Sequence, residues 1–296
     1  MINFADRLSA AIEAKNSRVV VGLDPHGDLL PHHLLRQGEE TRGTGPAGVA
    51  WAIARFNREI IDAVADHVVA VKPQLAFYER WGSLGIAALE ETITAAREAG
   101  LLVIMDGKRN DIGSTAQAYA ESYLGDGPLG SDALTINAYL GRDGVAPFLK
   151  DQQRGVFALV KTSNPSGGDL QDLDVDGRPL YYRVAELLTQ WGAGAEGRCG
   201  YQNIGFVVGA TYPEVLAQLR QAFPHNYFLI PGYGHQGGGV EDILPAFDDH
   251  GTGAVVNSSR GILFAYGQGG REEDFAGAAQ RAAQQMQEEI NEGLGL

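Results

Sequence analysis

Residues 101–113 read LLVIMDGKRNDIG, an apolar run followed at once by two acids, two bases and an amide. A strand that stays apolar along its whole length is buried on both faces, which is typical of a parallel sheet covered by helices. Seven more runs of this kind follow or precede it. Together the eight predicted strands span residues 18–24, 67–72, 101–106, 132–137, 155–161, 203–209, 227–232 and 253–259.

Segments with helical periodicity separate these strands. We expect helices over residues 48–66, 84–99, 114–124, 141–152, 180–191, 213–222, 240–250 and 272–292. Eight alternating units favour an α/β fold of the (β/α)8 barrel type over a doubly wound sheet. A further helix over 3–15 would close the bottom of the barrel. The prediction is one domain over 1–296, with irregular insertions near 25–46 and 163–202.

Composition limits the possible functions. Of 296 residues, 44% are hydrophobic and 20% are charged, and no apolar run approaches the roughly 18 residues that a membrane span needs. The N-terminal segment carries charges where a signal peptide has an apolar centre, so we expect a cytoplasmic protein without membrane contact. A net charge of −14 argues against nucleic acid as a partner. The one cysteine, Cys199, excludes an internal disulfide and a cysteine-based zinc site.

Polar residues stand at the ends of the predicted strands, where barrel enzymes place their reacting groups. In order, the strand ends are Asp24, Lys72, Asp106 with Lys108, Asn137, Lys161 with Ser163, Gly232 and Asn257, and all of these except Gly232 are polar. Asp106 and Lys108 are two apart on a strand and would face the barrel mouth together, either as reacting groups or as a simple ion pair. Asp111 has the position of a helix N-cap, and its spacing alone does not decide between a cap and a site residue.

Two glycine-rich segments predict a phosphate site. PGYGHQGGG at 231–239 lets backbone N–H groups approach an anion, and NSSRG at 257–261 supplies Arg260 for bidentate contact with phosphate oxygens. Barrels often bind phosphate with the loops after strands seven and eight, which is where both segments lie.

The motifs resemble one family. DGKRNDI at 106–112 is similar to the D-x-K-x-x-D-I signature of orotidine 5′-monophosphate decarboxylases. GLDP at 22–25, VKPQ at 71–74, TSNP at 162–165 and the pair PGYGHQGG and SSRG add to the likeness, and the long loops resemble the bacterial subgroup with extended loops. The resemblance implies a barrel that converts orotidine 5′-monophosphate to uridine 5′-monophosphate and carbon dioxide, in pyrimidine biosynthesis, without a cofactor or metal.

The resemblance also implies roles for individual residues. Four would form an alternating charged row with catalytic function: Lys72, Asp106, Lys108 and Asp111. Lys108 would stabilise a carbanion at ring carbon C6 and then protonate it. The rest would bind substrate: Asp24 and Lys72 the ribose, Ser163 the pyrimidine, and Gln236 and Arg260 the phosphate, with backbone at Gly234 and Ser259. Asp111, Ile112 and Thr115 would reach into the site of the other subunit of a homodimer.

Three other functions fit parts of the pattern. A magnesium-dependent sugar-phosphate decarboxylase or hexulose-phosphate synthase of the same barrel superfamily would use the acids to position a metal. Against it stand Ile112, Ser163 and Gln236, which favour a nucleotide substrate. A Schiff-base aldolase would use Lys161 or Lys108 as its nucleophile. A barrel that binds a phosphate ligand without turnover is the third.

Overall fold

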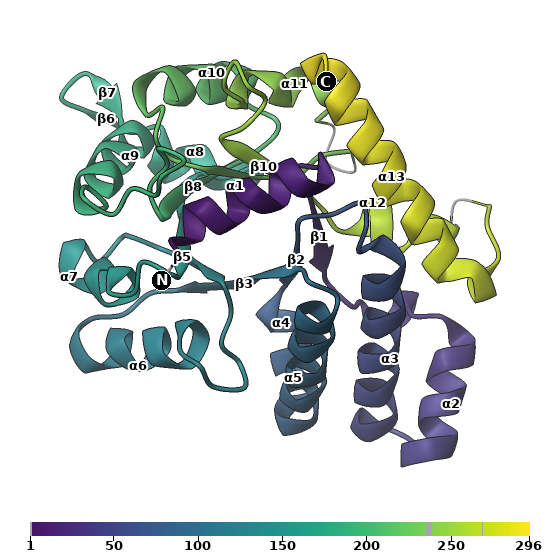
Figure 1. The fold of residues 1–296 in the computed structure, drawn as a ribbon. Coiled ribbons are helices and arrows are strands. Elements are labelled where there is room, and N and C mark those ends of the chain that lie inside the picture. The colour runs from purple at the N-terminus through teal and green to yellow at the C-terminus, as the bar shows by residue number, and fades with distance from the viewer. Residues whose placement is uncertain (1, 235–237, 268) are drawn as a thin grey trace.

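The computed structural model describes residues 2–234, 238–267 and 269–296. Within these ranges eight parallel strands close into a barrel in the order β1-β2-β3-β4-β5-β8-β9-β10, with β10 paired to β1 (Figure 1). The barrel strands are β1 (Val19–Leu23), β2 (Ala70–Pro73), β3 (Leu102–Arg109), β4 (Ala133–Ile136), β5 (Gly155–Lys161), β8 (Ile204–Val208), β9 (Phe228–Pro231) and β10 (Ala254–Ser258). The predicted (β/α)8 barrel is confirmed.

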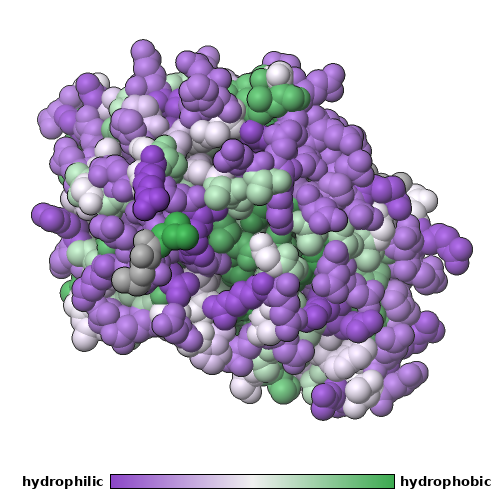
Figure 2. All heavy atoms as spheres, viewed as in Figure 1, coloured by the Kyte–Doolittle hydropathy of each residue, from purple (hydrophilic) through white to green (hydrophobic). Residues whose placement is uncertain are grey.

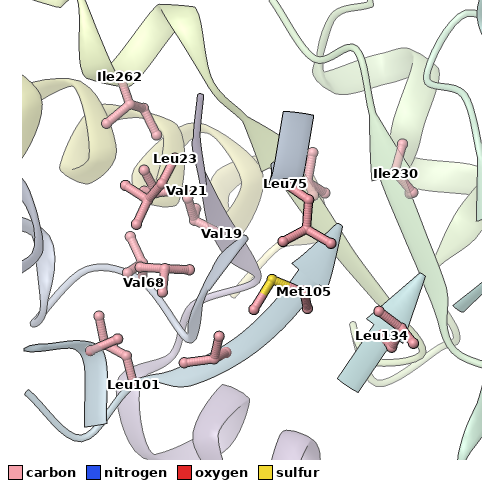
Figure 3. Close-up of a cluster of buried hydrophobic side chains, with 14 of the residues drawn as sticks. Val19, Val21, Leu23, Val68, Leu75, Leu101, Met105, Leu134, Ile230 and Ile262 are labelled. Atoms are coloured by element: carbon pink, nitrogen blue, oxygen red, sulfur yellow. The ribbon is translucent and has the colours of Figure 1, made fainter. Parts of the chain in front are cut away.

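Alternation along each strand produces two apolar layers. On β1, Val19, Val21 and Leu23 belong to the large cluster between barrel and helices, whereas Val20 belongs to a smaller cluster inside the barrel. Figure 3 shows part of the outer cluster, where side chains from several strands meet. Because side chains alternate between faces, the inward direction passes from Ile104 to Asp106 on β3. The side chains inside the barrel are therefore apolar toward the amino ends of the strands and charged toward their carboxyl ends.

Helices surround the strands. The longer ones are α2 (His32–Arg42), α3 (Pro46–Val64), α5 (Gly82–Glu98), α6 (Gly113–Leu124), α9 (Leu180–Trp191), α10 (Pro213–Ala222) and α13 (Phe275–Leu294). The short ones are α4 (Leu75–Glu79), α7 (Arg142–Val145), α8 (Gly168–Gln171), α11 (Val240–Ile243) and α12 (Arg260–Leu263), and a small antiparallel pair, β6 (Asp174–Val175) and β7 (Arg178–Pro179), follows α8.

Helix α1 (Phe4–Lys15) closes the bottom of the barrel, as predicted. It crosses the front of the barrel in Figure 1. Its buried residues Phe4, Ala5, Leu8 and Ile12 join the interior cluster, and the Phe4 ring meets Phe157 edge-on with 6.1 Å between the ring centroids. This face is mostly hydrophilic on its surface (Figure 2). None of the described helices is long and apolar enough to span a membrane.

The stretch 25–46, predicted to be irregular, contains helix α2. Its sequence is mostly polar, and only Leu34 and Gly38 are buried, so the apolar periodicity that would reveal a helix is weak. Contact with α3 stabilises it. A Cβ on Gly38 would lie 2.2 Å from the carbonyl oxygen of Gly48, so the missing side chain lets the two helices approach closely.

Two predicted helices are shorter than expected because each contains a proline. The segment 141–152 divides into α7 and a 3-10 turn, Ala146–Leu149, and 240–250 divides into α11 and a 3-10 turn, Leu244–Ala246. Pro147 and Pro245 have no N–H for an α-helical hydrogen bond. Strand β3 is longer than expected, since it continues through Lys108 to Arg109.

Candidate active site

A cavity of about 500 Å³ opens at the carboxyl ends of β1, β2, β3, β9 and β10. Strand ends at this edge of a barrel come together from distant parts of the chain, which is why residues near 24, 72, 106 and 257 share one site. The lining residues are Asp24, His26, Lys72, Gln74, Phe77, Asp106, Pro231, Gly232, Tyr233, Asn257, Ser258, Ser259 and Arg260.

A row of alternating charges begins at this cavity: Lys72 and Asp106 line it, and Lys108, which is not among the lining residues, is ion-paired with Asp106. The Asp106 carboxylate accepts hydrogen bonds from the Lys72 ammonium at 2.6 Å, through Oδ2, and from the Lys108 ammonium at 2.6 Å, through Oδ1. Lys72 and Asp106 are 5% and 6% exposed, whereas 46% of the Lys108 side chain is exposed. Lys108 is thus the most exposed member of the row.

The pairing overcomes the cost of burying these charges. Burial alone would raise the pKa of Asp106, but the adjacent Lys72 and Lys108 hold that pKa well below its ordinary value. Burial alone would lower the pKa of Lys72, but the attraction of Asp106 and then Asp24 leaves it raised. Both groups are therefore charged at neutral pH.

The cationic end of the cavity is formed by Arg260, at the start of α12, with Ser259 before it. Gly22 makes room for Ser259, because a Cβ at Gly22 would lie 2.0 Å from the Ser259 hydroxyl oxygen. Gly234 lines a neighbouring pocket instead of this cavity, and its N–H donates to the carbonyl of Gly238 at 2.8 Å. Gln236, predicted to bind phosphate, lies outside the described residues.

His26 stands between this cationic end and an aromatic wall. Its ring centroid is 4.4 Å from that of Phe77 and 6.2 Å from that of Phe264. Burial, followed by repulsion from Arg260, lowers the pKa of His26, although Asp24 acts in the opposite direction. At neutral pH the imidazole is uncharged, with ring nitrogens that can donate or accept hydrogen bonds at the cavity wall.

Two buried oxygens of the cavity have no hydrogen-bond partner among the described residues. They are Oδ1 of Asp24 and Oδ1 of Asn257, at the ends of the neighbouring strands β1 and β10. A buried acceptor without a donor is costly, so these atoms suit a ligand that brings hydroxyl groups.

Among the predicted site residues that do not line this cavity are Asp111, Ile112 and Thr115. The Asp111 carboxylate accepts the N–H of Ile112 at 2.8 Å, and 53% of the Ile112 surface is exposed. The helix-cap alternative for Asp111 is wrong, because the N-cap of α6 is Ile112 and no side chain of the described residues caps that helix. Among the described residues no ion pair joins Asp111 to Lys72 or Lys108.

Ser163 also lies outside the cavity, in the segment after β5. It packs against Gly209, where a Cβ would come within 2.9 Å of the Ser163 Cβ. The segment is tied back by Gln171, which accepts the N–H of Thr162 at 3.0 Å and donates to its hydroxyl at 2.7 Å. The buried Lys161 is ion-paired with Asp172 from the same segment.

Comparison with known proteins gives the family. A model described as "Orotidine 5'-phosphate decarboxylase / HUMPS family" matches residues 17–271. The chain belongs to this family. A protein of Rhodopirellula baltica named orotidine 5′-phosphate decarboxylase is 51% identical over 287 residues, which cover 94% of this chain and 93% of that protein. A protein of the same name from Caldicellulosiruptor saccharolyticus is 40% identical over 99% of this chain and 100% of its own length.

A solved member of the orotidine 5′-phosphate decarboxylase / HUMPS family has the same architecture. The structure of Leishmania donovani OMP decarboxylase matches with a TM-score of 0.79 and 33% identity, covering 100% of both chains. The barrel fold is thus that of the family.

Sequence reasoning missed several residues at the site of this family member. His26 directly follows GLDP, and Gln74 is the last residue of VKPQ. Their positions close to Asp24 and Lys72 in the sequence were therefore a usable signal. Phe77 had no such signal, because it depends on the short helix α4. Thr135, which donates to Asp106 Oδ1 at 2.8 Å, is a small polar residue within an apolar strand and could have been found as an inward-facing position on β4.

Proposed function

We propose that the protein decarboxylates orotidine 5′-monophosphate to uridine 5′-monophosphate and carbon dioxide, as a step of pyrimidine biosynthesis in the cytoplasm. The observation that carries the proposal is the ion-paired row Lys72–Asp106–Lys108, because its members Lys72 and Asp106 line the same cavity as Arg260. The names of the relatives agree with this activity.

In this scheme Asp106 supplies a fixed negative charge beside the substrate carboxylate. Two negative charges about 4 Å apart repel by roughly 4 kcal/mol at an effective dielectric of about 20. The repulsion is relieved when the bond from C6 to the carboxyl carbon breaks and carbon dioxide leaves. The bonding electron pair stays on C6, where the Lys108 ammonium stabilises it and then transfers a proton. Solvent returns a proton to the neutral amine, and no cofactor enters this scheme.

Arg260 acts at a distance from C6. A guanidinium binds phosphate oxygens in bidentate fashion, and binding energy from this non-reacting group can order the charged row around the ring. We assign the phosphate to Arg260 with Gln236 and the backbone at Gly234 and Ser259, and the ribose to Asp24 and Lys72. Oδ1 of Asp24, which has no hydrogen-bond partner in the described part of the chain, supports the ribose assignment.

We propose a homodimer in which Asp111, Ile112 and Thr115 of one subunit complete the active site of the other. Within each subunit's own site, Ser163 would contact the pyrimidine. The exposed apolar side chains near Asp111 support it. Ile112 is 53% exposed and Tyr139, which precedes α7, is 75% exposed. A Cβ on Gly144 of α7 would lie 2.9 Å from the Asp111 carbonyl oxygen, so the two segments are neighbours. Mixing Lys108→Ala with Asp111→Ala subunits should restore part of the activity, because one hybrid site then carries neither change.

A magnesium-dependent reaction is less well supported. The acid that would position a metal, Asp106, already accepts hydrogen bonds from two ammonium groups. Turnover that disappears on treatment with EDTA would favour the metal-dependent alternative.

The test of the proposed function follows the absorbance of orotidine 5′-monophosphate during turnover. Wild type should consume it, and Lys108→Ala should lose nearly all activity while keeping its thermal midpoint close to that of wild type. A matched control is Lys150→Ala, because Lys150 is an exposed lysine in a pocket lined by Asn3 and Asp6 of the N-terminal segment. An inactive wild type, or a Lys108→Ala variant with near-normal rate, would refute the proposal.

A further inference from the structure

The charged row is built on an irregularity in the sheet. Strands β3 and β4 pair at Met105 with Leu134 and again at Arg109 with Ile136. Three residues of β3 between these pairs, 106–108, therefore face a single residue of β4, Thr135. A bulge of this kind leaves backbone groups without their regular ladder partners, and bulges are frequent next to active sites.

Lys108 lies in this bulge with φ +46°, in the left-handed region. Residues other than glycine rarely adopt this conformation, which costs about 1–2 kcal/mol. It persists only where surrounding contacts impose it. The ladder resumes directly afterwards, since the N–H of Asn137 donates to the carbonyl of Arg109 at 3.0 Å.

The Thr135 hydroxyl occupies the gap in the ladder. It accepts the N–H of Lys108 at 3.0 Å and donates to Oδ1 of Asp106 at 2.8 Å. The directions are fixed by chemistry, because an amide N–H can only donate and an ionised carboxylate can only accept. Thr135 is 2% exposed, so no solvent replaces either bond.

Oδ1 of Asp106 is also the oxygen that receives the Lys108 ammonium, at 2.6 Å. The terminal torsion of an aspartate is broad, so its hydrogen bonds decide how the carboxylate plane is turned. The Thr135 hydroxyl is thus linked to Lys108 in two ways. It accepts the backbone N–H of Lys108 directly, and it shares Oδ1 of Asp106 with the Lys108 ammonium.

We propose that Thr135 is a positioning residue for proton transfer by Lys108, an inference that rests on the proposed function. It fixes the backbone of Lys108 in the bulge and the plane of Asp106, and so it sets the place of the ammonium relative to C6. It does not contact the substrate. Its loss should therefore reduce kcat and leave nucleotide binding nearly unchanged.

The test compares Thr135→Val, which keeps the shape and removes the hydroxyl, with Thr135→Ser, which keeps the hydroxyl. Loss of a hydrogen bond to a charged group corresponds to a fall in kcat of about tenfold to a hundredfold. We expect this for Thr135→Val, with KM and the Kd of uridine 5′-monophosphate within about twofold of wild type. Thr135→Ser should stay within about threefold of the wild-type kcat.

The matched control is Thr92→Val. Thr92 is also a buried threonine whose hydroxyl accepts one hydrogen bond, from Asn57, and donates one, to the carbonyl of Ala88. It lies on α5, away from the cavity, so its loss should lower the thermal midpoint and leave kcat unchanged. A purely structural role for Thr135 would give the same result as this control.

Several outcomes would overturn the inference. They are a Thr135→Val enzyme with kcat within twofold of wild type, a loss that falls on KM and Kd instead, and a Thr135→Ser enzyme as impaired as the valine variant. If Thr135→Val fails to fold, Thr135→Cys replaces it, since a thiol is a weak donor and should give an intermediate fall in kcat. A wild type that does not turn over orotidine 5′-monophosphate would refute the proposed function instead.

Discussion

Removal of the Asp106 carboxylate should leave Lys72 as a buried cation without its main partner. The two groups are 2.6 Å apart, and at an effective dielectric of about 20 their attraction is roughly 6 kcal/mol. Desolvation offsets part of this in the intact pair, and breaking a buried pair by removing one partner typically costs about 3–5 kcal/mol. We expect Asp106→Ala to lose that much free energy of unfolding at pH 7.

The loss should depend on pH in a defined direction. In wild type the pKa of Lys72 is raised, so its contribution to stability is complete below its unfolded pKa, about 10.4, and is lost only as pH rises through the still higher folded value. In Asp106→Ala, burial is opposed mainly by Asp24, and we expect it to lower the folded pKa of Lys72. Unfolded chains then bind more protons than folded ones, so the stability of the variant rises between the lowered pKa and about 10.4. The gap to wild type should shrink from pH 7 to pH 10.

The assay is urea unfolding followed by tryptophan fluorescence, at one protein concentration because subunit association affects apparent stability. The double variant Lys72→Met/Asp106→Ala serves as the control, since it removes both charges and should recover much of the lost stability. A gap that is equal at pH 7 and pH 10, or a double variant no more stable than Asp106→Ala, would refute the reasoning.

Three other predictions concern the cavity and the helices. Arg260→Ala should reduce kcat/KM by a factor of about 100 or more, although Arg260 is not expected to contact C6. With a substrate that lacks the phosphate, added phosphite should restore part of the rate of wild type and less of the rate of the variant. Uridine 5′-monophosphate should raise the pKa of His26 in an NMR titration, because a bound phosphate dianion offsets the repulsion from Arg260; an unchanged pKa would place the phosphate elsewhere. Gly38→Ala should destabilise the protein by about 1–3 kcal/mol through overlap with the carbonyl of Gly48, whereas Gly127→Ala, where a Cβ meets nothing within 4 Å, should be nearly neutral in thermal unfolding.

The barrel could be predicted because its strands are buried on both faces. An uninterrupted apolar run such as VVVGL in β1 allows few other structures, and all eight strands overlap their predicted ranges. Helix α2 could not be found in this way. Its stability depends on a close contact between Gly38 and Gly48, and a glycine inside a polar segment predicts a turn when the sequence is considered alone.

The same distinction applies to the site. Strand ends placed Asp24, Lys72, Asp106 and Asn257 together, since parallel strands of a barrel end at one edge. Strand alternation also predicted contact between Asp106 and Lys108, which is present, although the backbone between them is not a regular strand. The bulge depends on pairing with β4, and no local pattern in DGKRNDI indicates the left-handed conformation of Lys108.

That conformation has a consequence for evolution and for design. Lys108→Ala and Lys108→Gly both remove the ammonium, but at φ +46° glycine avoids a strain that alanine retains, so the glycine variant should be more stable by about 1 kcal/mol. The proposed chemistry thus requires a long side chain on a backbone shape that glycine adopts more easily. In a barrel released from selection for catalysis, glycine at position 108 would relieve this backbone strain but lose the ion pair with Asp106, so stability and activity constrain this position in different ways.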